Sequence, residues 1–259
     1  MKSNIRPAAV AGMFYPGEKH ELQRQVQQFL AEVSVKAPQP KAMIQPHAGY
    51  IYSGPVAATA YSQLQQHAET ITRVILLGPD HRVGFRGIAA PSADYFETPL
   101  GIVPLDQESI RSLVGVDLFD AAHQQEHSLE VQLPFLQQVL GDFSLVPLVI
   151  GSVESGEVAA VLRQLWGGDE TLIVVSSDLS HYHDYESARR IDAATTQAIE
   201  HFDSSSIGSN DACGYQGVRG LLQVAAEKGL QERTLDVRNS GDTAGPRNQV
   251  VGYGSYIFY

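Results

Sequence analysis

The chain has 259 residues, of which 43% are hydrophobic, and 18 Lys+Arg against 29 Asp+Glu give a formal net charge of -11. This composition is ordinary for a folded globular protein and excludes collagen-like, fibrous and disordered classes. The acidic balance, without any Lys/Arg-rich run, also argues against nucleic acid as a partner, because a phosphate backbone would be repelled.

Helical and strand patterns alternate along the chain. Apolar residues spaced at i, i+4, i+7, i+8 and i+11 predict an amphipathic helix over 18–33. Short apolar runs that lack in-and-out alternation predict buried strands at 42–44, 74–77, 145–150 and 172–175. Further helices are expected at 56–64, 129–140, 158–165, 185–201 and 218–228, and further strands at 234–237 and 250–259.

This order of elements predicts an α/β fold, a three-layer sandwich around a mixed, mainly parallel sheet. The chain shows no internal repeat, and its one Pro-rich spot, 37–40, is too short to separate domains. We therefore expect a single domain over 1–259.

Cysteine content and hydropathy indicate where the protein resides. The one cysteine, Cys213, cannot close an internal disulfide, so a reducing compartment is expected and the cytoplasm is the predicted location. Pro and Gly interrupt the apolar stretch near the N-terminus, which makes a poor signal peptide. The longest strongly apolar run, 145–153, is too short to span a bilayer, so no membrane association is expected.

Histidines follow three of the predicted strands. His47 comes after 42–44, His81 after 74–77, and His181 after 172–175. Parallel strands deliver their carboxyl ends to one edge of a sheet, where ligands bind, so these side chains should converge. Imidazoles and carboxylates bind divalent transition metals such as Fe, Cu, Ni and Zn. One such histidine would more often bond a neighbouring loop, but three on one edge favour a metal site.

The third ligand is expected in the small-residue loop after the strand 234–237, where Asp242 offers a carboxylate. With His47 and His81 it would complete a two-histidine, one-carboxylate set with open positions, which is typical of non-haem Fe(II) chemistry. The alternative is a turn aspartate that bonds its own backbone. The sequence leaves both interpretations open.

Other residues near these strand ends are candidates for catalysis or pocket lining. His181 carries an imidazole, the usual side chain for proton transfer, and Asp178 three residues earlier could orient it, so the pair suits acid–base catalysis. His127 and Glu130 could line the pocket or belong to a capped helix start. Tyr50 could form an aromatic wall or pack in the core. Cys213 could be reactive at a helix start or buried and inert.

Several segments, taken together and in order over nearly the whole chain, resemble the Memo family, called AmmeMemoRadiSam system protein B in prokaryotes. They are 11–16, 46–50, 78–81, 126–130, 176–181, 213–214 and 239–243. The resemblance implies a fold similar to class III, LigB-type extradiol dioxygenases. In that comparison His47 and His81 match the metal-binding histidines, and His181, with Asp178 beside it, matches the catalytic histidine.

One position departs from the family pattern. Eukaryotic Memo proteins have a cysteine as third ligand in the loop before the last strand, and this sequence has Asp242 or Thr243 there. The departure puts a thiolate-based copper redox activity in doubt. A carboxylate at this place would instead restore the ligand found in the dioxygenases.

Residues and resemblance together predict a metal-dependent, dioxygenase-like oxidoreductase acting on a small-molecule ligand. Iron(II) is the first expectation for the metal, with copper and zinc as alternatives. A different class of function is a non-catalytic binding or accessory protein of the Memo type that recognises a phosphorylated or acidic ligand or a partner enzyme. A zinc hydrolase is a third hypothesis. The prokaryotic family name suggests association with radical-SAM system partners.

Overall fold

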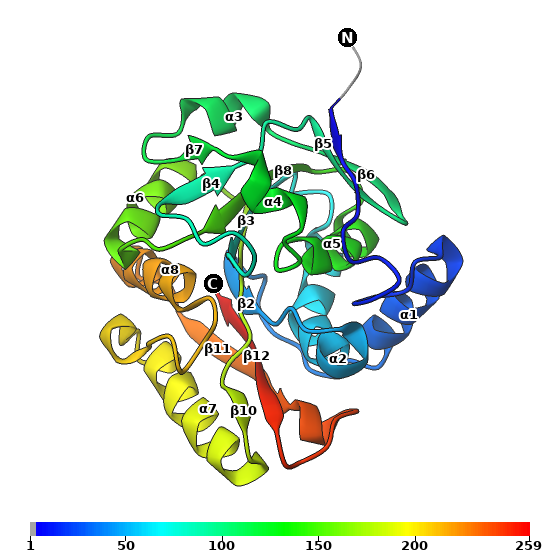
Figure 1. Cartoon of the computed structure of the whole chain (residues 1–259), viewed down its shortest axis with the longest axis vertical. Helices are drawn as coiled ribbons and strands as arrows, with labels where there is room; N and C mark the ends of the chain where they lie inside the picture. Colours follow the sequence, from blue (N-terminus) through cyan, green and yellow to red (C-terminus); the bar gives the residue numbers. More distant parts are fainter. Residues whose placement is uncertain (1–3) are drawn as a thin grey trace.

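The structure, a computed structural model, describes residues 4–259 and contains two sheets and their covering helices (Figure 1). The strands of the main sheet are β2 (Ala42–Gln45), β3 (Arg73–Pro79), β4 (Ile88–Ala90), β7 (Asp117–Leu118), β8 (Ser144–Ile150), β9 (Thr171–Ser176), β10 (His181–His183), β11 (Glu232–Asn239) and β12 (Val250–Phe258). A small second sheet is formed by β1 (Ile5–Arg6), β5 (Tyr95–Thr98) and β6 (Gly101–Pro104).

The helices cover both faces of the main sheet. They are α1 (Lys19–Ala31), α2 (Tyr50–Tyr61), α3 (Gln107–Ser112), α4 (Asp120–Gln124), α5 (Leu133–Leu140), α6 (Ser155–Leu165), α7 (Tyr185–Glu200) and α8 (Tyr215–Glu227). Short 3₁₀ helices are η1 (Ser62–His67), η2 (Glu130–Gln132), η3 (Ser204–Ser206) and η4 (Ser240–Asp242). Helices α1, α2 and α5 pack together on one side, and α6, α7 and α8 lie on the other (Figure 1).

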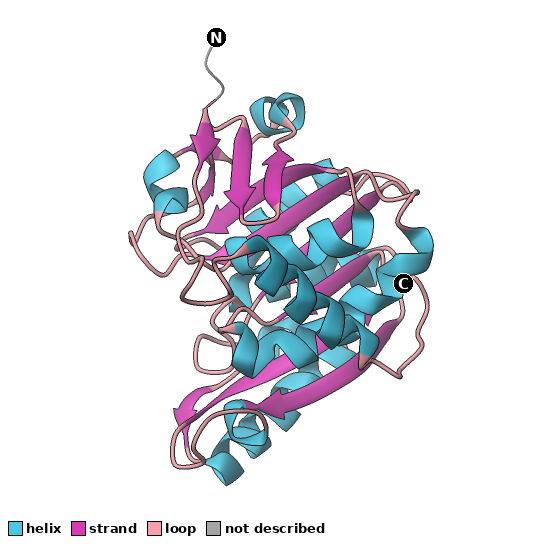
Figure 2. Ribbon diagram, turned by 90° about the vertical axis from the view of Figure 1, so that its right-hand side faces the viewer, coloured by secondary structure: helices cyan, strands magenta, loops and turns pink. Residues whose placement is uncertain are grey.

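The strand order in the main sheet is β10-β12-β2-β9-β3-β8-β4-β7, with β11 paired to β12. The four central strands β2, β9, β3 and β8 are parallel to one another, whereas β12 and β4 join them antiparallel on either side. Figure 2 shows these strands running side by side across the molecule. The predicted three-layer α/β sandwich around a mixed sheet with a parallel centre is confirmed.

Burial on both faces explains why the central strands carry continuous apolar runs. Every residue of β2 and β9 is buried, and in β3 and β8 all but the first residue are buried. Parallel strands sandwiched between helix layers have no solvent face, so they need no polar alternation. A cluster of buried apolar side chains runs from α1 and α2 through these strands to α6 and α8.

The structure differs from the predicted elements most in two regions, and the short strands β1 and β10 were also not predicted. Helix α2 begins at Tyr50 rather than at residue 56, and its first turns include Gly54 and Pro55, which obscure the helical pattern. Gly54 is required there because a Cβ would collide with the ring of Phe29 on α1. The short elements between 88 and 124 were not predicted, since strands of two to four residues carry too little periodicity.

Helix lengths also bear on membrane association. Over residues 4–259, each helix is either too short or too polar to cross a bilayer.

Candidate metal centre

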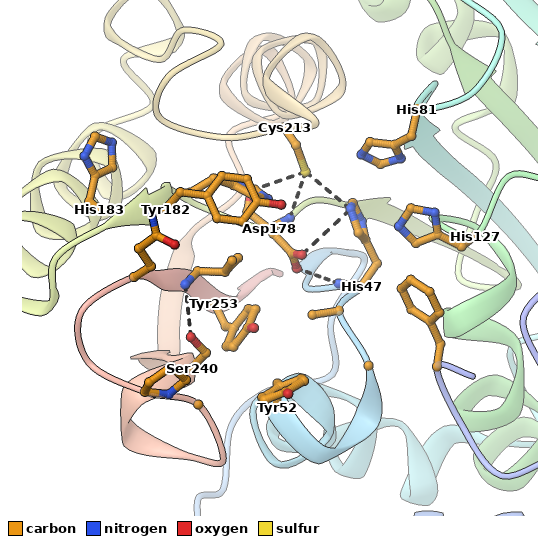
Figure 3. A pocket seen from close by; sticks show the side chains of 18 of the residues that line it. His47, Tyr52, His81, His127, Asp178, Tyr182, His183, Cys213, Ser240 and Tyr253 are labelled. Carbon is orange, nitrogen blue, oxygen red and sulfur yellow. Dashed lines mark hydrogen bonds and ion pairs between the residues drawn. The ribbon is translucent and has the colours of Figure 1, made fainter. Parts of the chain in front are cut away.

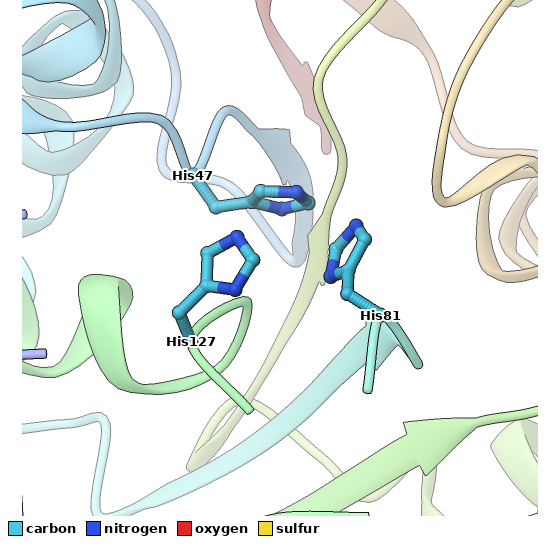
Figure 4. Close-up of side chains that lie close together, drawn as sticks. All are labelled: His47, His81 and His127. Atoms are coloured by element: carbon cyan, nitrogen blue, oxygen red, sulfur yellow. The ribbon is translucent and has the colours of Figure 1, made fainter. Parts of the chain in front are cut away.

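Three histidines from three separate loops meet at the carboxyl-end edge of the main sheet. His47 follows β2, His81 follows β3, and His127 lies between α4 and η2. One ring nitrogen from each lies within 4.8 Å of the others, a spacing that could hold a metal ion. Their ring centroids are 4.7–5.4 Å apart, and Figure 4 shows the three rings gathered around a common space.

His47 is the most enclosed of the three, with 2% of its surface exposed. Its Nδ1 lies 2.9 Å from the hydroxyl of Ser176, the last residue of β9. Burial lowers the pKa of His47 well below its usual value, and the neighbouring histidines lower it further. The imidazole is therefore neutral at physiological pH, the form that can bind a metal.

His81 is oriented by Glu126, which sequence reasoning did not identify as a site residue. Its Nδ1 lies 2.9 Å from Glu126 Oε1, and its backbone N–H donates to Oε2 at 2.7 Å. Burial acts to raise the pKa of Glu126, but its contacts with His81 and the N–H of Ser128 outweigh burial and lower that pKa to about 2. Metal-binding histidines usually donate their second ring N–H to a carboxylate, because this hydrogen bond fixes the ring. In His81 the bond from Nδ1 to Glu126 leaves Nε2 free.

His127 supplies the observation that tests whether the cluster suits a metal. Its Nδ1 is buried and lies 3.3 Å from Glu126 Oε1, yet it forms no hydrogen bond with any of residues 4–259. Burial lowers the pKa of His127 to about 4, although Glu126 opposes this shift, so the ring is neutral. Buried polar atoms normally have a partner. A cation held by the three rings would provide one, and the donor set of three imidazoles therefore fits a transition metal.

The cluster opens into a pocket of about 760 Å³ that also contains Asp178 and Cys213 (Figure 3). His181 lines the same pocket. Asp178 is buried, and its Oδ1 accepts the backbone N–H of His47 at 2.7 Å. His181 Nδ1 lies 2.8 Å from the carbonyl oxygen of Leu179, which can only accept a hydrogen. This contact requires a proton on Nδ1 of His181, so Nε2 is the unprotonated nitrogen whenever the ring is neutral.

Cys213 lies closer to the cluster than its sequence context indicates. Its Sγ is 3.3 Å from Nε2 of His47 and accepts the N–H of Asp178 at the same distance. Burial raises the pKa of the thiol, and the Asp178 carboxylate raises it further, so Cys213 is a neutral thiol. A neutral thiol agrees with the interpretation of Cys213 as buried and inert. Its sulfur nevertheless lies beside His47, a histidine of the cluster.

Asp242, expected as the third ligand, does not join the histidines. Its carboxylate accepts the hydroxyl of Tyr185 and, at 3.1 Å, the backbone N–H of Asn239. Asp242 lines a separate pocket beside α7, and Thr243 bonds the carbonyl oxygen of Ser240. The turn interpretation of Asp242 thus describes one of its contacts, the bond from Asn239 in its own loop, and Tyr185 on α7 supplies the other. We replace Asp242 by His127 in the candidate ligand set.

Tyr50 and Glu130, proposed as pocket residues, are both absent from the described pocket lining. Tyr50 is buried in the aromatic core, where its hydroxyl donates to the carbonyl oxygen of Val131 at 2.7 Å. Glu130 is fully buried and paired with Arg6. Both residues are near the site in sequence, but their side chains face the packing between α1, α2 and α5 and the N-terminal strand.

His127 shows what the strand-end rule misses. The residue does not follow a strand of the central sheet, so sequence reasoning offered it only as a pocket-lining alternative. The one local signal is its adjacency to Glu126, whose carboxylate accepts the backbone N–H of both His127 and Ser128 and so shapes this loop.

A buried carboxylate next to the site provides a pH-dependent prediction. Asp192 on α7 accepts the N–H of Ser180, and burial raises its pKa to about 6 although that N–H opposes the shift. The folded state then binds the proton more tightly than the unfolded state, so the free energy of unfolding falls as pH rises from about 4 to 6. Asp192→Asn keeps an acceptor oxygen without the charge. Wild type should lose stability over this range and the variant should not. The free energy of unfolding of Asp192→Asn minus that of wild type should therefore increase by about 2–3 kcal/mol from pH 4 to pH 7.

Urea unfolding of both proteins across this pH range measures the difference. A constant difference between Asp192→Asn and wild type would show that the carboxyl has an ordinary pKa.

Comparisons with known proteins agree on one family. The family profile described as Memo-like protein matches residues 6–257. A MEMO1 family protein of Aquifex aeolicus is 36% identical over 98% of this chain and 99% of its own. MEMO1 family proteins of Thermotoga neapolitana and Methanosarcina barkeri are each 34% identical over 98% of this chain and 99% of their own. Matches of this extent, with the segments that resemble the family, show that the chain belongs to the Memo family.

Proposed function

We propose that this protein is a metal-dependent, dioxygenase-like oxidoreductase acting on a small molecule. The observation that carries the proposal is the cluster of His47, His81 and His127 in a pocket of about 760 Å³. Imidazole ligands suit Fe, Cu, Ni and Zn. We propose iron(II) first, with copper and zinc as alternatives that the same donors accept. The absence of cysteine pairing in a chain with one cysteine supports a cytoplasmic location.

When bound, the metal would supply Lewis-acid and redox chemistry to a substrate in the pocket. The chain's own contribution to proton transfer is assigned to His181. Its Nδ1–H is held by the carbonyl oxygen of Leu179, so Nε2 is available to take a proton from a bound molecule.

The pocket walls favour an uncharged, planar ligand. Aromatic rings of Phe14, Tyr52, Tyr182 and Tyr253 line the pocket, and Lys and Arg are absent from its described lining. A phosphorylated or acidic ligand would be expected to meet a cationic side chain. The lining therefore supports a small aromatic substrate over the phosphorylated or acidic ligand of the binding-protein hypothesis.

Oxygen uptake by the iron-loaded protein with a panel of catechols tests this function. His181→Ala should reduce kcat roughly 10²–10⁴-fold, as expected for loss of a general acid–base group, and should leave the metal content unchanged. His201→Ala, which removes an exposed histidine at the end of α7, is the matched control and should retain wild-type activity.

Two results would contradict the proposal in different ways. A bound metal with no oxygen uptake on any substrate would favour a binding or accessory protein. Stable zinc with hydrolytic activity and no oxygen uptake would favour the zinc hydrolase.

A further inference from the structure

A buried hydrogen-bond chain lies behind His47, on the side away from Cys213. It runs from Tyr61 on α2 through Gln132 in η2 to Ser176 at the end of β9. All three side chains are buried, with exposures of 0–1%. Because water does not reach them, each hydrogen must go to one of the partners present, and the direction of every bond can be worked out.

The amide orientation of Gln132 is set by its neighbours. One amide atom lies 2.9 Å from the carbonyl oxygen of Pro46, which can only accept, so that atom is the nitrogen Nε2. The other, Oε1, accepts the hydroxyl of Tyr61 at 2.8 Å. Since Nε2 also lies 2.8 Å from Ser176 Oγ, Gln132 donates to the serine.

The serine hydroxyl then has one hydrogen to give. Ser176 Oγ lies 2.6 Å from the carbonyl oxygen of Ser128, which can only accept, so the hydroxyl hydrogen is used there. The remaining contact, 2.9 Å to Nδ1 of His47, must therefore be donated by the histidine. His47 carries its proton on Nδ1, and its Nε2 is unprotonated.

We propose that Ser176, held by Gln132, is a positioning residue that fixes the Nδ1–H tautomer of His47 and so keeps Nε2 free for a ligand. The tautomer stands on the hydrogen-bond directions alone, whereas its use in metal binding rests on the proposed function. His81 is supported differently, by the ionised Glu126. The hydroxyl of Ser176 is neutral, so it fixes the His47 ring without placing a carboxylate at Nδ1 of this buried residue.

Removing the hydroxyl should change which nitrogen is protonated. In Ser176→Ala, Nδ1 loses its acceptor, while Nε2 still has Cys213 Sγ at 3.3 Å and Asp178 Oδ2 at 3.9 Å. The Nε2–H tautomer should therefore become populated, and the nitrogen that a metal needs would be blocked.

Nitrogen chemical shifts of the metal-free protein with ¹⁵N-labelled histidine report the tautomer directly. Wild type should show a protonated Nδ1 and an unprotonated Nε2 for His47, and Ser176→Ala should show a shift toward the opposite pattern. Titration with Co²⁺ should show affinity about 10–100-fold weaker in Ser176→Ala than in wild type. Ser255→Ala is the matched control, because Ser255 is an equally buried serine bonded to Gln45 and not to a histidine.

The outcomes separate this proposal from the proposed function. A protonated Nε2 in wild-type His47 overturns the tautomer assignment without any variant. Wild-type tautomer and Co²⁺ affinity in a folded Ser176→Ala protein overturn the positioning role. Failure of wild type to bind Co²⁺, with Nδ1 still protonated, contradicts the metal function but leaves the tautomer assignment intact.

Discussion

His47→Ala, His81→Ala and His127→Ala should each abolish stoichiometric metal binding. Elemental analysis of protein purified without oxygen and reconstituted with iron should give about one iron per chain in wild type and near zero in the variants. The loss should exceed the roughly 10–100-fold change in affinity expected when only a hydrogen-bond partner of a ligand is removed. The cause is geometric, because the three ring nitrogens lie within 4.8 Å of one another and each supplies one donor.

Asp242→Ala is the informative control for this experiment. Its carboxylate is engaged by Tyr185 and the backbone of Asn239, so the variant should retain its metal. Metal lost in Asp242→Ala but retained in His127→Ala would reverse the assignment. The centre would then be the two-histidine, one-carboxylate set expected from sequence, and the loop from 240 to 249 would have to rearrange on binding.

Glu130→Ala should cause the largest loss of stability of any single change considered for this chain. The buried Glu130 carboxylate pairs with Arg6, accepts the N–H groups of Ala9 and Val10, and accepts the hydroxyl of Tyr15. Truncation leaves the guanidinium of Arg6 buried without its charge partner, which costs about 3–5 kcal/mol. For a chain of this size the melting temperature should fall by roughly 6–20 °C in calorimetry.

Glu186→Ala provides the surface comparison. Glu186 lies 3.8 Å from Arg189 on the exposed side of α7, and such pairs contribute little because water screens them. Both variants remove one carboxylate of an ion pair, so a difference between their melting temperatures reports the effect of burial. A melting temperature of Glu130→Ala equal to that of Glu186→Ala would contradict a structural role for the buried pair.

The sequence determined the central architecture through local patterns. The strands β2, β3, β8 and β9 were predictable because burial on both faces requires continuous apolar runs. Helices α1 and α7 were predictable because each buries one apolar stripe. The rule that ligands bind at the carboxyl ends of parallel strands also identified His47, His81 and His181, which line one pocket.

The tertiary structure alone decided which other side chains enter that pocket. His127 reaches the cluster because Glu126 shapes the loop that carries it. The distance from this loop to His47, which follows β2, depends on the packing of the whole sheet. Asp242 and Glu130 carry the right chemistry, but Tyr185 and Arg6, far away in sequence, hold their carboxylates elsewhere. Periodicity reports which face of an element is buried, whereas the direction of a loop side chain is set by partners that only the folded chain brings together.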